Sequence, residues 1–133
     1  MDVLQPEGWP RPRGYANGVA AQGRIVAVAG QVGWDPATLR IVSDDFAAQA
    51  GQALRNVAAV LAAAGAQPSD VVRLTWYVTD REVYIAAQEA VGREYRAVFG
   101  AHYPAMTLVV VAGLLEPGAK VEIEATAVLG ARG

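Results

Sequence analysis

Apolar residues recur at steps of three and four along two stretches of this chain, a spacing that predicts amphipathic helices. The first helix is expected over residues 44–64, where Ser43 can cap the start and Gly65 is placed to end it in a left-handed conformation. Its apolar positions are Phe46, Ala50, Ala53, Leu54, Val57, Leu61 and Ala64. The second is expected over residues 81–99, where Thr79 or Asp80 can cap the start. Its apolar positions are Tyr84, Ala87, Val91, Tyr95, Val98 and Phe99.

Elsewhere the chain is rich in β-branched residues and interrupted by turn signals, which predicts strands. The strands are expected over residues 15–22, 24–31, 71–79, 103–111 and 120–128. Gly23 is expected to join the first two as a hairpin, and Glu116-Pro117-Gly118 marks the turn between the last two. The order strand, strand, helix, strand, helix, strand, strand (ββαβαββ) favours an α+β fold with a mixed sheet. Right-handed crossovers then place both helices on one sheet face.

The fourth predicted strand carries more apolar residues than one buried face requires. Residues 108–111 read Leu-Val-Val-Val, so both strand faces are apolar there. Apolar residues make up 53% of the chain and charged residues only 18%. Because the two helices can cover one sheet face, a second subunit is favoured over the other, which predicts a homo-oligomer. The 133 residues are expected to form a single domain over 1–133.

Charge and residue types narrow the function further. The net charge of −2 and the isoelectric point near 5.3 provide no basic surface for nucleic acid, so no nucleic-acid partner is expected. The chain has no cysteine and one histidine, His102, which excludes thiolate catalysis and makes a zinc cluster unexpected. It shows neither a leader peptide nor the roughly 18 uninterrupted apolar residues of a membrane span. A cytoplasmic protein without a membrane partner is therefore expected.

Several short motifs along the chain, taken together, resemble those of one protein family. They are Gly14-Tyr15-Ala16, Val28-Ala29-Gly30-Gln31, Leu54-Arg55-Asn56-Val57, Asp70-Val71-Val72-Arg73-Leu74-Thr75 and Pro104-Ala105-Met106-Thr107. On these motifs the chain is similar to the Rid family, the reactive-intermediate deaminases, also called YjgF-like or endoribonuclease L-PSP-like proteins. The resemblance covers nearly the whole chain. It implies a chorismate-mutase-like α+β fold assembled as a homotrimer, with small-molecule ligands in clefts between subunits.

The resemblance also implies a set of site residues. Glu122 stands where the family has a glutamate associated with the hydrolytic water, and a carboxyl group can both donate a proton and activate water. Tyr15, Ala29, Met106 and Leu108 are expected to bind the substrate beside this catalytic glutamate. In a cleft lined by Met106 and Leu108, desolvation is expected to favour the neutral form of the Glu122 carboxyl group.

This chain departs from the family pattern at positions that hold the ligand. Met106 replaces the arginine that binds the carboxylate of an imino acid, Ala29 replaces a serine, and Gly92 replaces an asparagine. The substrate is therefore expected to lack the usual carboxylate anchor, and hydrolysis of small imino acids such as 2-iminopropanoate is not expected. Arg11 or Arg13, on the proline-rich arm near the N-terminus, is an alternative source of a guanidinium for an anion.

Two functions stay open. The first is an imine or enamine hydrolase of the deaminase type, in which Glu122 works with water and without a metal or organic cofactor. The second is a non-catalytic homotrimer that holds a metabolite in its clefts, with Met106 as plain packing and Glu122 as a surface charge on an edge strand. The ribonuclease activity attributed to some family members suits an acidic chain poorly.

Overall fold

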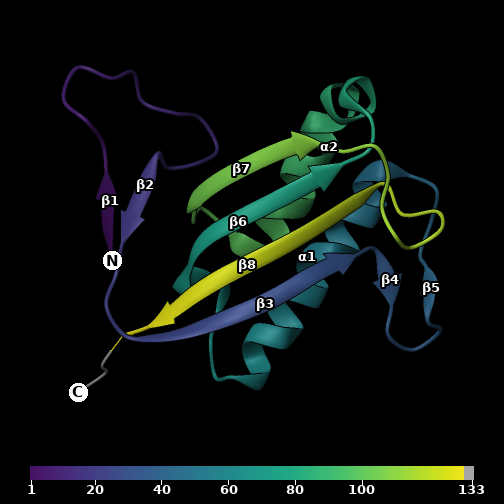
Figure 1. Cartoon of the computed structure of the whole chain (residues 1–133), viewed down its shortest axis with the longest axis horizontal. Coiled ribbons are helices and arrows are strands. Elements are labelled where there is room, and N and C mark those ends of the chain that lie inside the picture. Colours follow the sequence, from purple (N-terminus) through teal and green to yellow (C-terminus); the bar gives the residue numbers. More distant parts are fainter. Residues whose placement is uncertain (131–133) are drawn as a thin grey trace.

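Two helices pack against one face of a four-stranded mixed sheet in the computed structural model, which describes residues 1–130 (Figure 1). The strands lie in the order β3-β8-β6-β7. Their bounds are Arg24–Val32 for β3, Val121–Leu129 for β8, Val71–Val78 for β6 and Ala105–Val110 for β7. β7 runs parallel to β6, and β8 is antiparallel to both β3 and β6. The predicted α+β class and the placement of both helices on one face are confirmed.

The two helices begin and end close to where the sequence pattern places them. α1 spans Phe46–Ala63 and α2 spans Arg81–Phe99. Asp45 and Asp80 cap them by accepting hydrogen bonds from backbone N–H groups of the first helical turn, at 2.9 and 3.1 Å. Asp45 therefore caps α1 in place of the predicted Ser43, whose hydroxyl accepts from Asp45 N instead. Gly65 follows α1 with a φ of 75°, a left-handed conformation that glycine adopts without strain. Neither helix is long and apolar enough to cross a membrane.

The N-terminal strands pair differently from the expected hairpin. β1 (Asp2–Leu4) and β2 (Gly18–Ala20) form a two-stranded ribbon beyond one end of the main sheet (Figure 1). The hairpin prediction is therefore wrong, because β3 joins the inner strand β8, where alternate residues reach the core, rather than the short β2. Two short paired strands, β4 (Trp34–Asp35) and β5 (Arg40–Ile41), lie between β3 and α1. A 3₁₀ helix, η1 (Pro68–Asp70), lies between α1 and β6.

Two buried polar side chains of α1 hold the loops around it. Gln49 is fully buried, and Asn56, further along the same helix, is also buried. Asn56 donates to two backbone carbonyls between β3 and β4, at 3.1 and 2.9 Å. Gln49 bonds three backbone groups, namely Ser43 O (2.8 Å), Gly118 O (3.0 Å) and Lys120 N (2.8 Å). Asn56, which belongs to the family-like motif on α1, therefore has a structural role.

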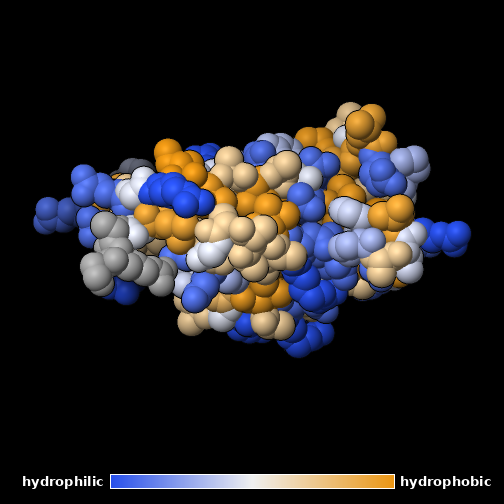
Figure 2. All heavy atoms as spheres, turned by 90° about the horizontal axis from the view of Figure 1, so that it is seen from below, coloured by the Kyte–Doolittle hydropathy of each residue, from blue (hydrophilic) through white to orange (hydrophobic). Residues whose placement is uncertain are grey.

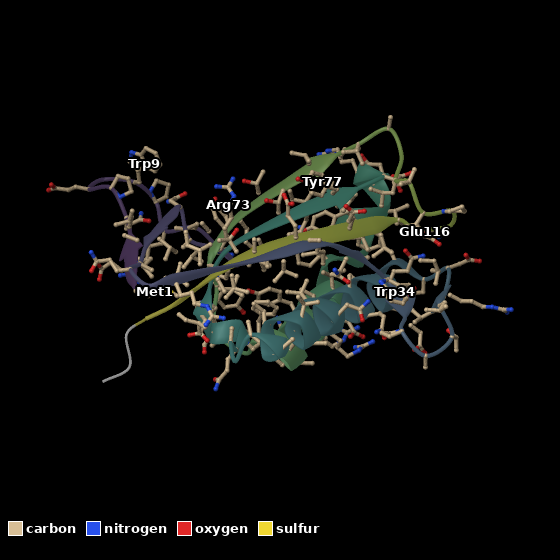
Figure 3. All side chains as sticks on the ribbon, turned by 60° about the horizontal axis from the view of Figure 1, so that its bottom comes forward. Met1, Trp9, Trp34, Arg73, Tyr77 and Glu116 are labelled. Atoms are coloured by element: carbon tan, nitrogen blue, oxygen red, sulfur yellow. The ribbon has the colours of Figure 1, made fainter. Side chains whose placement is uncertain are left out.

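The two sheet faces differ in character because side chains alternate along each strand. Along β8, Ile123 faces the helices and is fully buried, whereas Glu122 and Glu124 point to the other face. Figure 3 shows Arg73 and Tyr77 of β6 also pointing away from the helices. We call this side the open face. No element within residues 1–130 covers it.

Apolar residues stay exposed on the open face and along the molecule's edge. Ile25 on β3 is 70% exposed and Val109 on β7 is 40% exposed, and both point to the open face. Seen from below, the molecule presents apolar surface over its middle, between more hydrophilic ends (Figure 2). Exposed apolar surface of this kind is typical of faces that contact another protein.

Candidate functional site

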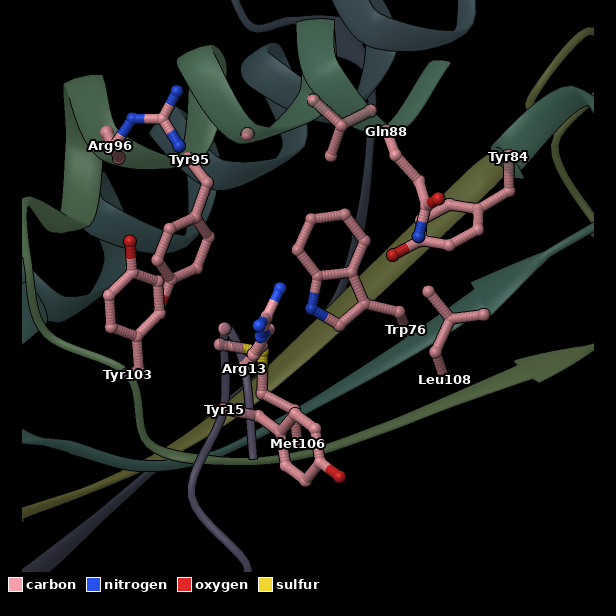
Figure 4. Close-up of a pocket in the computed structure, with 13 residues that line it drawn as sticks. Arg13, Tyr15, Trp76, Tyr84, Gln88, Tyr95, Arg96, Tyr103, Met106 and Leu108 are labelled. Atoms are coloured by element: carbon pink, nitrogen blue, oxygen red, sulfur yellow. The ribbon is translucent and has the colours of Figure 1, made fainter. Parts of the chain in front are cut away.

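A cavity of about 410 Å³ opens between α2 and the part of the sheet formed by β6 and β7 (Figure 4). Trp76, Met106 and Leu108 line its sheet side. These side chains share one face because the parallel ladder pairs Trp76 with Leu108, and Leu74 with Met106. We call it the α2–β7 cavity. Its volume is typical of sites for small organic ligands.

The opposite wall is built from α2 at a regular spacing of four residues. The residues on this face are Tyr84, Gln88, Gly92 and Arg96. Side chains four residues apart lie on one side of a helix, so this spacing gives the cavity a continuous helical wall. A β-carbon added to Gly92 would lie 3.1 Å from Arg96 Nη1. The missing side chain of Gly92 therefore leaves room for the Arg96 guanidinium to lie back along the helix.

The N-terminal arm closes a third side of the cavity with Arg13 and Tyr15. The arm is fixed to the sheet where Ala16 N donates to Pro104 O at 2.9 Å, beside the first residue of β7. Tyr15 is thereby held next to Met106, and both side chains line the cavity (Figure 4). Arg11 lines a neighbouring hollow rather than this cavity. Of the two arginines weighed as substitutes for the missing guanidinium, the structure thus brings Arg13 to the cavity.

A stack of tyrosine rings forms one end of the cavity. Tyr95 and Tyr103 lie nearly parallel, with ring centroids 5.4 Å apart and an interplanar angle of 11°. The Tyr95 hydroxyl donates to His102 O at 2.6 Å, and burial, followed by the neighbouring Tyr103, raises the pKa of Tyr95 well above its ordinary value. The His102 ring bonds Val71 O at 2.7 Å through Nε2, which ties this loop to β6. His102 therefore acts here as a structural contact.

The structure separates the predicted site residues into two groups. Tyr15, Met106 and Leu108 meet in the α2–β7 cavity, but Glu122 lies on the open face. Ala29 lies on an exposed bulge of β3, and a β-carbon added to its neighbour Gly30 would overlap the Glu122 carboxyl group. The expected cleft shared by Glu122, Met106 and Leu108 is thus not formed within one chain. The reason is that Glu122 pairs with Tyr77 across the ladder, whereas Met106 pairs with Leu74 on the helix side.

Glu124 has a defined partner on the open face. The Tyr77 hydroxyl donates to Glu124 Oε1 at 2.6 Å. This hydrogen bond, together with desolvation and the nearby carboxylates, raises the pKa of Tyr77. β8 is an inner strand, so the alternative that places the Glu122 charge on an edge strand is wrong about the strand's position in the sheet. The described residues contain no group of three or more metal-ligating side chains.

Sequence reasoning missed several residues of the cavity. Trp76 belongs to none of the sequence motifs, and Tyr84 is predicted only as part of the apolar stripe of the second helix. Arg96 was not singled out, although its spacing of four from Gly92 would have placed it on the same helix face. The sequence pattern predicts Tyr103 only as part of a strand. All four line the cavity.

Comparison with known proteins gives a consistent result over almost the whole chain. The family model described as Endoribonuclease L-PSP matches residues 10–129. The 2-iminobutanoate/2-iminopropanoate deaminase of Salmonella typhimurium is 39% identical over 117 residues, covering 86% of this chain and 86% of that protein. The human protein of the same name is 35% identical over 107 residues, covering 80% of this chain and 74% of the human one. A solved structure of a Yersinia pestis protein of unknown function from the conserved Rid family has a TM-score of 0.84 at 36% identity, covering 96% of this chain and 98% of that one.

Proposed function

This chain belongs to the Rid family, the YjgF-like proteins matched by the Endoribonuclease L-PSP model, and on that basis we propose that it is a deaminase-type hydrolase of small imines or enamines. The observation that carries the proposal is the meeting of Tyr15, Met106 and Leu108 around one cavity of ligand size. The names of the Salmonella and human relatives supply the reaction class. In that reaction water adds to the imine carbon, the C–N bond breaks, and a ketone or aldehyde and ammonia leave.

Glu122 is proposed as the group that handles protons in this reaction. A carboxyl group can protonate the leaving nitrogen or an enamine carbon and, as a carboxylate, can activate the attacking water. Within one chain Glu122 lies on the face opposite the cavity, so the cavity of one subunit needs the Glu122 of another. This requirement, together with the uncovered open face, supports a homotrimer with one cleft at each subunit boundary. We propose that each complete site combines an α2–β7 cavity with a neighbouring subunit's Glu122.

Met106 sets the substrate range in this proposal. A thioether offers no charge and only a weak hydrogen-bond acceptor, so a carboxylate placed against β7 finds no cationic partner there. The protein must therefore bind its substrate through contacts other than one between a substrate carboxylate and residue 106. We expect little acceleration of 2-iminopropanoate hydrolysis for this reason.

The proposal is tested by following ammonia release from imines generated in place by an amino-acid oxidase. A panel of imines with aliphatic and aromatic side chains is compared for the native chain and for Glu122→Gln. We expect the native chain to accelerate at least one imine, and Glu122→Gln to lower that rate by roughly 10²-fold or more, as for loss of a general acid–base group. Native-like rates for Glu122→Gln would contradict the role of Glu122, and the absence of acceleration for every imine would contradict the enzyme proposal.

A second candidate function is supported by the separation of Glu122 from the cavity within one chain. In that case the protein is a homotrimer that binds a metabolite without converting it. Sedimentation of the Glu122→Ala variant separates the two functions. A trimer that has lost turnover supports the enzyme. Loss of the trimer, with ligand binding and no turnover in the native chain, supports the binding protein and gives Glu122 a structural role.

A further inference from the structure

The α2–β7 cavity contains a buried hydrogen-bond donor without a partner. Trp76 is 4% exposed, and its Nε1 makes no hydrogen bond to any described residue. In Figure 4 the Nε1 edge of the indole is on the same side as Met106 and Arg13. Unpaired buried donors are costly and uncommon in native proteins, so each one calls for an explanation. An acceptor atom on a bound ligand would satisfy this one.

The cavity also has an excess of positive charge. Arg13 and Arg96 line it, and none of its lining residues is an aspartate or glutamate. Neither guanidinium forms an ion pair within residues 1–130, whereas Arg93 on the same helix pairs with Glu89 at 3.6 Å. Gly92 leaves the space into which Arg96 lies. The cation lost from β7 at position 106 is thus replaced by two cations on the other walls of the cavity.

Aromatic rings make up much of the remaining wall. Trp76 lies on the sheet side, Tyr84 lies on the α2 side, and the stacked pair of Tyr95 and Tyr103 lies at one end. Flat rings favour flat, conjugated ligands, because stacked and edge-to-face contacts add to the burial of apolar surface. The volume of about 410 Å³ is larger than a two- or three-carbon imino acid needs. This volume suits a ligand with a single ring or with two fused rings.

We propose that the α2–β7 cavity binds an aromatic carboxylate: a flat ring system packs against Trp76 and the tyrosines, Arg13 and Arg96 neutralise the carboxylate, and Trp76 Nε1 donates a hydrogen bond to the ligand. This proposal rests on the proposed function, which supplies the reacting imine or enamine group, and it adds the class of ligand that carries this group. The substrate class is then an aromatic imine or enamine that carries a carboxylate. The carboxylate is held from α2 and the arm, and not from β7.

Calorimetric titration of the full chain with three probes tests this ligand class. The probes are 2-naphthoate, its neutral counterpart 2-naphthamide, and acetate. We expect 2-naphthoate to bind about tenfold or more tightly than 2-naphthamide, since a charge-assisted contact is worth about a factor of ten. Acetate should bind far more weakly than either. Equal affinity for 2-naphthoate and 2-naphthamide, acetate binding as strong as 2-naphthoate, or no binding of any probe would overturn the proposal.

A pair of double variants assigns the charge preference to named residues. In Arg13→Met/Arg96→Met the affinity ratio of 2-naphthoate to 2-naphthamide is expected to fall to about one, because both cavity cations are lost. Arg11→Met/Arg93→Met changes the net charge equally, on the same arm and the same helix, but removes no cavity residue. It should keep the native ratio. A retained ratio in the first double variant, or an equal loss in the second, would overturn the assignment.

The donor is tested by Trp76→Phe, which keeps a ring and removes the N–H. Binding of both naphthyl probes is expected to weaken about threefold to tenfold, and unchanged binding in a folded variant would refute a role for Nε1. Imine turnover and 2-naphthoate binding are measured separately, and their separate outcomes distinguish this proposal from the enzyme proposal. Failure of every imine to react, with 2-naphthoate still bound, would contradict only the enzyme. Turnover of imines without any preference for 2-naphthoate would contradict only the ligand class.

Discussion

The buried side chain of Gln49 offers a direct test of how the loop between β7 and β8 is held. It bonds three backbone groups, Ser43 O, Gly118 O and Lys120 N, at 2.8 to 3.0 Å. Gln49→Met keeps nearly the same volume in the core and removes all three hydrogen bonds. The substitution should therefore unpair backbone groups without opening a large void.

The size of the effect follows from these three contacts. A hydrogen bond of this kind contributes about 1 kcal/mol net, so the free energy of unfolding should fall by about 3 kcal/mol. For a chain of 133 residues, an unfolding entropy of about 2.1 cal/mol/K per residue converts this into a Tm lowered by roughly 10 °C. Amide exchange at Lys120 should also become faster than in the native chain, because its N–H loses its acceptor.

Urea unfolding at one fixed protein concentration measures the change, since assembly would otherwise shift the apparent stability. Gln88→Met is the matched control, because Gln88 is exposed on α2 and has no hydrogen bond to a described residue. The control should stay within about 0.5 kcal/mol of the native chain. A Gln49→Met variant that is also within about 0.5 kcal/mol would refute the reasoning that Gln49 anchors this loop.

Three further predictions concern the cavity, the α1 packing and pH. Met106→Arg should restore a cation on β7 and strengthen acetate binding about tenfold in calorimetry; unchanged binding would show that the methionine is not what limits small carboxylates. Gly33→Ala should lower the free energy of unfolding by about 2 to 3 kcal/mol in urea titrations, because its β-carbon would lie 2.6 Å from Gln49 Cα, while Gly113→Ala, with open space around it, should change little. The raised pKa of Tyr95 means that its neutral hydroxyl stabilises the fold fully below the ordinary tyrosine pKa of about 10, and that this contribution is lost as the pH rises above that value. Between pH 9 and about 11, the free energy of unfolding should therefore fall less steeply with pH in Tyr95→Phe than in the native chain. An identical dependence on pH in the two proteins would contradict the burial argument.

The helices and the order of the main elements could be predicted from the sequence because their signals are local. The period of apolar residues along α2 and the capping Asp80 depend only on neighbouring residues. The pairing of β3 was predicted wrongly because strand partners are chosen by contacts far apart in the sequence. Turn signals around Gly23 indicate a bend, but they do not tell whether the partner is the preceding strand or a distant one such as β8.

The site was predicted in part for a related reason. Motif resemblance identified Tyr15, Met106 and Leu108, which the structure brings together. Their separation from Glu122 depends on which face of β7 packs against the helices. A strand that is apolar on both faces carries no alternation to decide this, so only its register with β6 does. The role of Arg96 likewise depends on the space beside Gly92, which is visible only in three dimensions.

We propose that this Rid protein hydrolyses imines, with a preference set by an aromatic cavity that lacks a cation on β7. The most direct test compares two imines generated by an amino-acid oxidase, 2-iminopropanoate and the imine of phenylpyruvate, by the rate of keto-acid release with and without the native chain. We expect clear acceleration for the phenylpyruvate imine and little for 2-iminopropanoate. Acceleration of 2-iminopropanoate alone, or of neither imine, would contradict the proposal.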